Sequence, residues 1–265
     1  MRPLSPGTAL APRLHVLEHL HRSQRLDVYD AWCDRRACRV AAKVLRPDRL
    51  RDRSARRALI AEGRLLRRLC HPHLVRGYDV HDAERPVVVL ETLAGETLEH
   101  LAETRTLSAA ELRHLAAHLA SALGYLHGEG IVHLDVKPSN VVADGARAKL
   151  IDLSIARRPG RTPAGRGTWC TMAPEQARGG TVGPAADVWG LGVTLWHAAT
   201  GVNPFEHLPE RYPQLRHRAA PLRDHRRLPA RLVTVIDASL EPDPRDRPAI
   251  DDVLAAVTAG TLAAM

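Results

Sequence analysis

The sequence has few aromatic residues, and this shortage narrows the possible partners. Only 3% of the 265 residues are Phe, Trp or Tyr, although the formal net charge is +8. Sites for single-stranded nucleic acid combine basic grooves with exposed aromatic rings. The composition therefore argues against a nucleic-acid partner, and we ascribe the charge to arginines on solvent-exposed faces.

Cysteines and long apolar segments are also scarce. Four cysteines in a chain of this length do not give the dense pattern of a disulfide-stabilised secreted domain. No apolar run approaches the ~20 residues that a membrane-spanning helix needs. Residues 1–12 contain three prolines and no sustained apolar stretch, unlike a signal peptide. We expect a soluble, cytoplasmic protein with no membrane partner and with a short flexible tail over residues 1–12.

Lysine and asparagine are rare as well, so the few that are present draw attention. Of the 38 Lys and Arg residues, only Lys43, Lys137 and Lys149 are lysines, and Asn140 and Asn203 are the only asparagines. A lysine ammonium is a compact charge, whereas the arginine guanidinium is a planar fork. Positions that keep lysine in such a chain are candidates for chemistry that needs a compact cation.

One short segment gathers several such residues. Residues 133–140 contain Asp135, Lys137 and Asn140, and Asp152 follows twelve residues after Asn140. Two carboxylates, an ammonium and a carboxamide are the groups that hold Mg²⁺ and orient a hydroxyl against a triphosphate. The segment therefore predicts phosphoryl transfer.

The order of predicted elements divides the chain near residue 94. The first part is rich in expected strands, with one helix over residues 54–69; the strands are expected at residues 14–20, 27–33, 39–44 and 87–90. The second part is mostly helical. We expect one helix after the capping box of Ser108 and Glu111, ending near Gly128, another over residues 187–200 that Gly201 ends, and a last helix from about residue 250. Residues 203–229 are expected to form a long irregular connection.

Taken together, these motifs resemble the eukaryotic-type protein kinase family, and especially its bacterial Ser/Thr kinases. The resemblance extends from about residue 13 to residue 260. It implies a bilobal α+β fold, with a small antiparallel N-lobe carrying one helix over residues 13–93 and a larger helical C-lobe over residues 94–265. It also implies that ATP and Mg²⁺ are the cofactors and that a protein is the substrate.

The resemblance assigns roles to the polar residues. Lys43, in the segment Val40-Ala41-Ala42-Lys43, contacts phosphates and pairs with Glu62 nineteen residues later. Asp135 orients the acceptor hydroxyl and accepts its proton, and Lys137 neutralises the transferred group. Both are expected to contact Thr168. The remaining nucleotide- and metal-binding residues by resemblance are Asn140 and Asp152 for Mg²⁺, and Leu20, Val28, Ala41, Glu91 and Leu93 for the nucleotide.

The segment from Gly167 to Glu175 resembles the end of a protein-kinase activation segment. By resemblance Glu175 pairs with Arg247, and Asp187 binds the backbone of the catalytic loop. Small-molecule kinases lack this Ala-Pro-Glu region, and Lys137-Pro138 favours Ser/Thr over Tyr as the acceptor. The expected reaction is transfer of the ATP γ-phosphoryl group to a Ser or Thr hydroxyl.

The chain departs from the family pattern at the phosphate-covering loop. His21, Ser23, Gln24 and Leu26 stand where glycines are expected. Glycine lets backbone amides approach phosphate and adopt φ > 0. Losing two charge-assisted hydrogen bonds would cost at most about 3–6 kcal/mol.

Two further departures affect regulation and the metal-binding segment. Leu134 replaces the arginine that answers a phosphorylated activation segment, so we hypothesise that activity does not depend on that phosphorylation. Leu153-Ser154 replaces Phe-Gly after Asp152.

Two alternatives to the protein kinase prediction remain open. The first is a pseudokinase that acts as a binding or scaffolding module, which the missing glycines favour. The second is a small-molecule phosphotransferase.

The histidines of Cys70-His71-Pro72-His73 match a family turn better than a metal site. The sequence leaves the substrate, the mode of regulation and the oligomeric state open.

Overall fold

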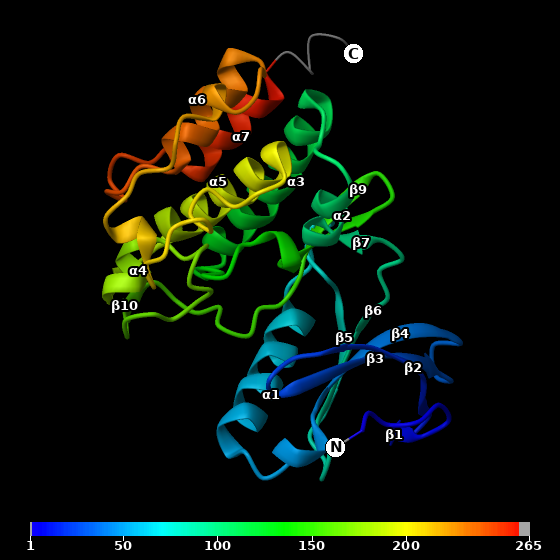
Figure 1. The fold of residues 1–265 in the computed structure, drawn as a ribbon. Helices are drawn as coiled ribbons and strands as arrows, with labels where there is room; N and C mark the ends of the chain where they lie inside the picture. Colours follow the sequence, from blue (N-terminus) through cyan, green and yellow to red (C-terminus); the bar gives the residue numbers. More distant parts are fainter. Residues whose placement is uncertain (1, 260–265) are drawn as a thin grey trace. The chain divides into compact units, whose positions relative to one another are not determined.

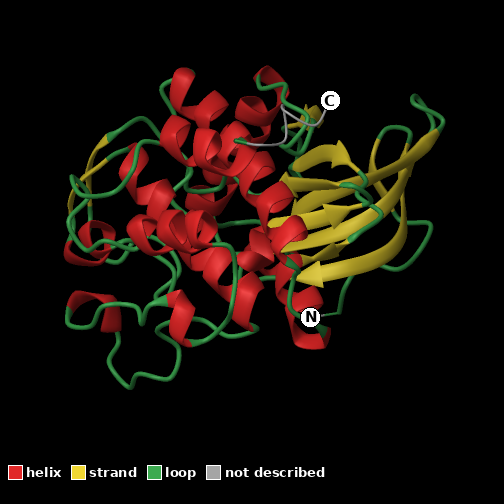
Figure 2. Ribbon diagram, turned by 90° about the horizontal axis from the view of Figure 1, so that it is seen from above, coloured by secondary structure: helices red, strands yellow, loops and turns green. Residues whose placement is uncertain are grey.

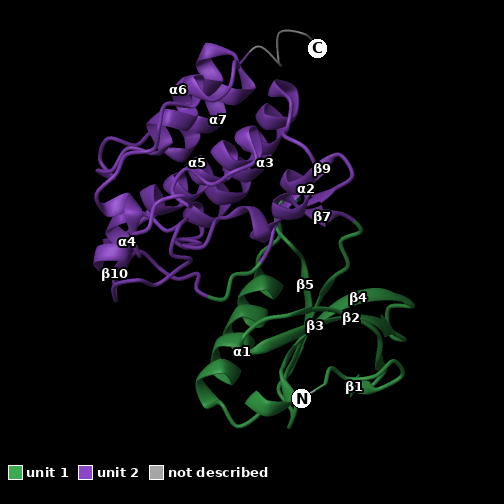
Figure 3. Ribbon diagram, viewed as in Figure 1, with its two compact units in different colours: residues 1–94, 152–154 green, residues 95–151, 155–265 purple. Residues whose placement is uncertain are grey.

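The computed structural model describes residues 2–259, and these form two compact units (Figure 3). Unit 1 comprises the chain up to Ala94 together with Asp152–Ser154, and unit 2 comprises Gly95–Ile151 and the chain from Ile155 onward. Residue 1 of the expected tail and residues 260–265 of the expected C-lobe lie outside the described residues.

Unit 1 is built on an antiparallel sheet of six strands (Figure 1). In spatial order the strands are β1 (Ala9–Ala11), β2 (Leu14–Arg22), β3 (Leu26–Cys33), β4 (Cys38–Leu45), β6 (Val87–Glu91) and β5 (Gly77–His81). A short 3-10 turn, η1 (Pro47–Arg49), precedes the helix α1 (Arg53–Arg68).

Alternation along the strands gives the sheet two apolar faces. One face packs against α1 through Leu45, Leu59 and Val88. A Cβ added to Gly63 of α1 would lie 2.6 Å from Val88 Cγ2, so this glycine allows close approach of helix and sheet. Its cost in helix propensity, about 1 kcal/mol relative to alanine, is offset by that packing.

The opposite face of the sheet is covered by the N-terminal segment. Leu10 of β1 is buried and packs on the cluster around Tyr29 and Val40. The structure therefore differs from the expected flexible tail at residues 9–11, which pair with β2. The physical reason is that Leu10 covers apolar side chains that would otherwise face water.

Unit 2 is mainly helical. Its α-helices are α2 (Leu98–Thr104), α3 (Ala109–Gly128), α4 (Pro174–Arg178), α5 (Pro184–Thr200), α6 (Ala230–Ser239) and α7 (Ile250–Thr258). Its 3-10 turns are η2 (Pro138–Asn140), η3 (Pro213–Leu215) and η4 (Leu222–Asp224). Two small sheets complete it: β7 (Glu96–Thr97), β8 (Val141–Asp144) and β9 (Arg147–Leu150), and the pair β10 (Gly160–Thr162) and β11 (Gly180–Val182).

Local sequence signals explain the ends of the two long helices. Ser108 Oγ accepts from Glu111 N and Glu111 Oε2 accepts from Ser108 N, so the predicted capping box of α3 is confirmed. Gly201 ends α5 with a φ of 84°, in the left-handed region that glycine adopts readily. Helix α5 is buried along most of its length and packs against α3 and α6.

The predicted α+β fold class is confirmed. Figure 2 shows the strands of the large sheet of unit 1 side by side. Sequence analysis did not predict β5, α2, α6 or the short strands of unit 2. Among residues 2–259, no helix combines the length and apolarity needed to cross a lipid bilayer.

Candidate active site

In unit 1, the strand β4 and the helix α1 bring Lys43 and Glu62 together. Lys43 Nζ lies 2.8 Å from Glu62 Oε1 and 3.0 Å from Oε2. The side chains are 10% and 1% exposed, so this ion pair is buried. Strand alternation puts Lys43 on the face that α1 covers, and the glycine next to Glu62 permits the short approach.

Asp152 adds a second carboxylate to this ammonium. Its Oδ1 lies 3.3 Å from Lys43 Nζ and accepts a hydrogen bond of 3.0 Å from Ser154 N. Asp152 has a φ of 65°, a backbone conformation that residues other than glycine rarely adopt. Such strain clusters at functional sites.

Electrostatics fix the protonation of this cluster. Burial disfavours the charged ammonium, but the carboxylates of Glu62 and Asp152 outweigh burial and raise the pKa of Lys43. Burial also opposes the charge of Asp152, yet Lys43 and the Ser154 hydrogen bond lower the pKa of that carboxyl below its usual range. Burial raises the pKa of Glu62. Lys43 is therefore charged across the physiological pH range.

In unit 2, three side chains form a hydrogen-bonded set around a hydroxyl. Thr168 Oγ1 donates to Asp135 Oδ1 at 2.7 Å and accepts from Lys137 Nζ at 2.7 Å. Lys137 Nζ also lies 2.9 Å from Asp135 Oδ2. Asp135 is thus placed to accept a proton from a hydroxyl, with an ammonium beside it.

Asn140 is fixed to the same loop. Its Nδ2 donates to the Asp135 carbonyl oxygen at 2.9 Å and to Asp135 Oδ2 at 3.0 Å. Because both bonds use the amide nitrogen, the carboxamide oxygen of Asn140 lies on the other branch of the side chain. That oxygen is a ligand of the kind that Mg²⁺ prefers.

The buried carboxylate of Asp187 binds the backbone of the loop that carries Asp135. Asp187 accepts hydrogen bonds from His133 N at 2.8 Å and Leu134 N at 2.7 Å, as predicted, and its Oδ2 lies 2.9 Å from His127 Nε2. Leu134 has a φ of 66°, so the bonds of Asp187 stabilise a strained backbone next to Asp135.

The predicted ion pair between Glu175 and Arg247 is also present. Arg247 Nη1 and Nη2 lie 2.7 and 2.9 Å from the two Glu175 oxygens, and the arginine side chain is fully buried. It ties the end of the activation segment to the segment before α7.

The predicted nucleotide-binding residues of unit 1 occupy different settings. Val28 lies opposite Lys43 in the register of β3 and β4, and Ala41 lies on the same face two residues before Lys43. Leu20 stands at a bulge of β2 with 54% exposure. Glu91 ends β6 and its Oε1 accepts from Arg76 N, while Leu93 follows outside the strand. Val28, Ala41 and Lys43 are therefore neighbours on the paired strands β3 and β4.

Each unit contributes one oxygen donor of the kind that magnesium binds. Among the described residues, no group of three or more His, Cys, Asp and Glu could hold a metal. Mg²⁺ does not need such a group, because it is commonly bound through one or two carboxylates together with substrate phosphates and water. The carboxylate of Asp152 and the carboxamide oxygen of Asn140 supply oxygen ligands of that type.

Sequence analysis missed one supporting residue, Gln176. Its Nε2 donates to the carbonyl oxygens of Leu134 and Arg166, both at 2.9 Å, and its Oε1 accepts from Ala173 N. The side chain is buried and links the activation segment to the loop of Asp135. Its only sequence signal is its place directly after Pro174-Glu175.

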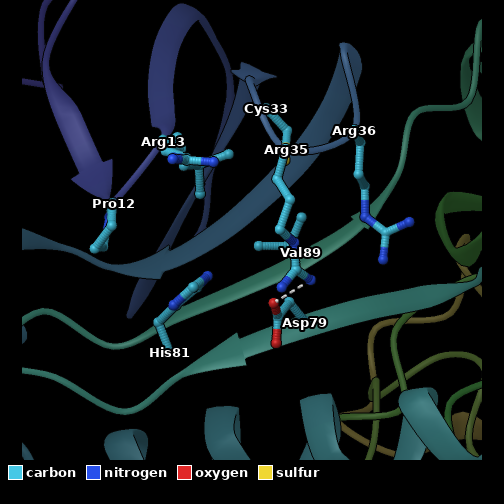
Figure 4. Close-up of a pocket in the computed structure, with 9 residues that line it drawn as sticks. Pro12, Arg13, Cys33, Arg35, Arg36, Asp79, His81 and Val89 are labelled. Carbon is cyan, nitrogen blue, oxygen red and sulfur yellow. Dashed lines mark hydrogen bonds and ion pairs between the residues drawn. The ribbon is translucent and has the colours of Figure 1, made fainter.

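A separate cavity of about 320 Å³ lies on the face of the unit 1 sheet opposite α1 (Figure 4). Arg13, Arg35 and His81 surround it, and Arg35 Nη2 lies 3.0 Å from Asp79 Oδ2. None of the predicted site residues lines this cavity, so we do not assign the chemistry to it.

Comparison with known proteins gives consistent matches. The family model described as "Protein kinase domain" matches residues 16–257. Serine/threonine-protein kinase PknB of Mycobacterium tuberculosis is 36% identical over 180 residues, which are 63% of this chain and 29% of that protein. The DNA damage-responsive serine/threonine-protein kinase RqkA of Deinococcus radiodurans is 32% identical over 274 residues, covering 98% of this chain and 38% of that protein.

A third relative and a solved structure extend the comparison. Serine/threonine-protein kinase PkaA of Streptomyces coelicolor is 34% identical over 81% of this chain and 41% of its own length. The matches thus span less than half of these relatives. A crystal structure of the kinase domain of Mycobacterium tuberculosis PknI, a cysteine-to-alanine mutant, matches with a TM-score of 0.77 and 26% identity. It covers 97% of this chain and 98% of that one.

Proposed function

Because this chain belongs to the protein kinase family, we propose that it transfers the γ-phosphoryl group of Mg-ATP to a serine or threonine hydroxyl of a protein substrate. The observation that carries this proposal is the set formed by Asp135, Lys137 and Thr168, in which a carboxylate accepts a hydrogen bond from a hydroxyl beside an ammonium. A scaffold has no physical need for that arrangement.

Each polar residue has a role in the proposed reaction. Asp135 orients the acceptor hydroxyl and takes its proton as the oxygen bonds to phosphorus and the bond to the ADP oxygen breaks. Lys137 stabilises the charge of the group in transfer. Lys43, fixed by Glu62, binds phosphate oxygens.

The metal would be held by Asn140 and Asp152. Bound Mg²⁺ neutralises charge on the phosphates. The hydrogen bonds of Asn140 to Asp135 orient its carboxamide, and the hydrogen bond from Ser154 N orients the Asp152 carboxylate. Leu20, Val28, Ala41, Glu91 and Leu93 are proposed to complete the nucleotide site.

We also propose limits for the domain and a compartment for the reaction. The kinase domain is proposed to run from residue 13 to residue 260, with its small lobe ending near residue 93, and the family match over residues 16–257 supports these limits. A cytoplasmic compartment is proposed because four cysteines in a chain of 265 residues do not give the dense pattern of a disulfide-stabilised secreted domain.

A phosphorylation assay tests the proposal. The unmodified chain is incubated with Mg-ATP and a generic basic protein, beside an Asp135→Asn variant. We expect phosphate on Ser or Thr of the acceptor and a loss of about 10²- to 10⁴-fold in the variant, which is the usual contribution of a general base. If the unmodified chain binds ATP but transfers no phosphate, it is a binding module and the proposal is wrong.

A further inference from the structure

The turn between β2 and β3 is the segment where the family has glycines and this chain has none. Ser23, Gln24 and Arg25 form this exposed turn. Two-residue hairpin turns usually need φ > 0, which is why glycine or asparagine is common there. In the described part of the chain, the residues other than glycine with positive φ are Arg13, Ala37, Leu134 and Asp152. The turn is therefore made without the left-handed conformation.

Arg46, just after β4, holds three successive carbonyl groups of this turn. Its Nη1 donates to the oxygens of Ser23 and Gln24, each at 3.3 Å, and its backbone N–H donates to the Arg25 oxygen at 3.0 Å. The guanidinium is fixed in turn by Asp48, with Nε and Nη2 each 3.0 Å from a carboxylate oxygen.

A serine hydroxyl makes this arrangement possible. In an ordinary tight hairpin the Leu26 N–H would donate to the Ser23 carbonyl. Here it donates to Ser23 Oγ at 3.1 Å, while Ser23 N donates to the Leu26 oxygen at 2.8 Å. The Ser23 carbonyl is thereby released to accept from Arg46.

The orientation of the carbonyls determines the orientation of the amides. In a trans peptide the C=O of one residue and the N–H of the next point in opposite directions, and the described chain contains no cis peptide. Since the Ser23 and Gln24 carbonyls face Arg46, the N–H groups of Gln24 and Arg25 point away from it. Successive amides turned to one side form an anion-binding concavity.

The base of the hairpin is fixed by a partly buried ion pair. Arg22 and Asp27 lie opposite each other in the register, and Arg22 Nε and Nη2 lie 2.7 and 2.9 Å from the two carboxylate oxygens. Asp27 is fully buried and also contacts His19 Nε2 at 3.1 Å. The strands below the turn therefore cannot slide or splay without breaking this pair.

We propose that Arg46, held by Asp48, is a positioning residue that replaces the family's glycines by turning the Gln24 and Arg25 amides toward the nucleotide phosphates. This inference rests on the proposed function, because it concerns the nucleotide of that reaction. Arg46 acts on the phosphates through the turn and not through its own charge.

The test compares Arg46→Ala with a matched control, Arg56→Ala. Arg56 of α1 makes the same kinds of contact at the turn between β5 and β6, where it pairs with Asp82 and donates to the carbonyls of Ala83 and Glu84. We expect Arg46→Ala to raise the KM for ATP about tenfold while kcat changes less than about threefold, which corresponds to about 1.4 kcal/mol of binding. Arg56→Ala is expected to leave both unchanged.

Arg46→Lys separates positioning from charge. Lysine keeps the charge but lacks the fork that grips Asp48 and two carbonyls together, so the KM is expected to rise in this variant as well. A KM like that of the unmodified chain in Arg46→Lys, or equal KM values in Arg46→Ala and Arg56→Ala, would overturn the inference. If Arg46→Ala does not fold, as judged by thermal unfolding, Arg46→Lys carries the test.

Nucleotide binding distinguishes this inference from the proposed function. The Kd for Mg-ATP is measured by calorimetry in the Asp135→Asn background, with and without Arg46→Ala. A tenfold weaker Kd supports the inference even if the unmodified chain transfers no phosphate, in which case only the proposed function fails. An unchanged Kd contradicts the inference even if phosphate transfer is observed.

Discussion

At the scale of single residues, backbone strain marks the two motifs that sequence analysis singled out. Leu134 and Asp152 both have positive φ, and hydrogen bonds fix the backbone at each position. At Leu134, the backbone N–H donates to Asp187. At Asp152, the carboxylate accepts from Ser154 N and pairs with Lys43. A non-glycine residue in this conformation costs about 1–3 kcal/mol. That cost is offset only because buried groups fix the conformation, which points to function at these positions.

Lys43 gives the first residue-scale prediction, because it is the shared partner of two carboxylates. Lys43→Met is expected to lower the free energy of unfolding by about 3 kcal/mol, since it leaves buried charges unpaired, and to lower phosphate transfer at least about 10²-fold. Urea unfolding and the phosphorylation assay measure the two effects. Lys149→Met, on β9 and outside the predicted site, is the control.

The pH dependence of that variant has a definite sign. Without the ammonium, burial raises the folded-state pKa of Glu62 further above its unfolded value, so the folded variant binds protons more readily. Stability that depends on a raised pKa is present at low pH and is lost as pH rises. The deficit of Lys43→Met is therefore expected to be full at pH 7 and to shrink as pH falls toward about 4.3, the ordinary pKa of glutamate. A deficit that grows on acidification would contradict the buried pair.

At the scale of elements, the activation segment is held by buried contacts. Thr162 of β10 and Thr171 are both buried, and Thr171 Oγ1 donates to the backbone carbonyl oxygen of Thr168 at 3.4 Å. A phosphate on either hydroxyl would have to displace this packing. In the family an arginine pairs with such a phosphate. This chain has Leu134 at that position, and its side chain is buried.

We therefore predict activity without phosphorylation of these threonines. Thr162→Ala and Thr171→Ala are each expected to keep phosphate transfer within about threefold of the unmodified chain. Thr171 Oγ1 makes one weak hydrogen bond, which contributes only about 1 kcal/mol, and Thr162 Oγ1 has no hydrogen-bond partner among the described residues. The measurement is the initial rate with dephosphorylated protein. Loss of transfer in either variant, with thermal stability retained, would show that the hypothesis drawn from Leu134 is wrong.

The elements also show where sequence reasoning succeeds. The long helices α1, α3 and α5 lie where they were expected. Their apolar periodicity and capping residues are features of the local sequence, which needs no distant partner to be recognised. The pair β10 and β11 joins residues about twenty positions apart, and short strands of this kind depend on a partner that local patterns do not reveal. The same holds for Gln176 and the Arg46 contacts, since each is defined by backbone carbonyls of a distant segment.

At the scale of the whole molecule, the predicted site residues fall in both compact units. Lys43, Glu62 and Asp152 belong to unit 1, whereas Asp135 and Asn140 belong to unit 2. Contacts within each unit hold the members of each set together, and the family resemblance predicts that both sets act on the same nucleotide. A ligand that uses residues of both sets would stabilise the folded chain as a whole by mass action.

The last prediction therefore concerns the response of the whole chain to nucleotide and metal. Mg-ATP at one hundred times its Kd is expected to add about 2.7 kcal/mol to the free energy of unfolding. For a chain of this size that is a rise of at least about 5 °C in the unfolding midpoint. Chelating Mg²⁺ with EDTA is expected to remove most of the rise, because the Asp152 carboxylate would then repel the phosphate oxygens, with no cation to neutralise their charges.

Variants assign this response to the two sets of residues. Asp135→Asn is expected to keep the rise, since the role proposed for Asp135 concerns the acceptor hydroxyl, whereas Lys43→Met and Asp152→Asn are expected to lose it. Differential scanning calorimetry with and without EDTA measures all of these midpoints. A rise that persists in Lys43→Met and in EDTA would mean that the nucleotide binds elsewhere on the chain. The Lys43, Glu62 and Asp152 cluster would then be a structural ion-pair network, of the kind that also perturbs pKa values.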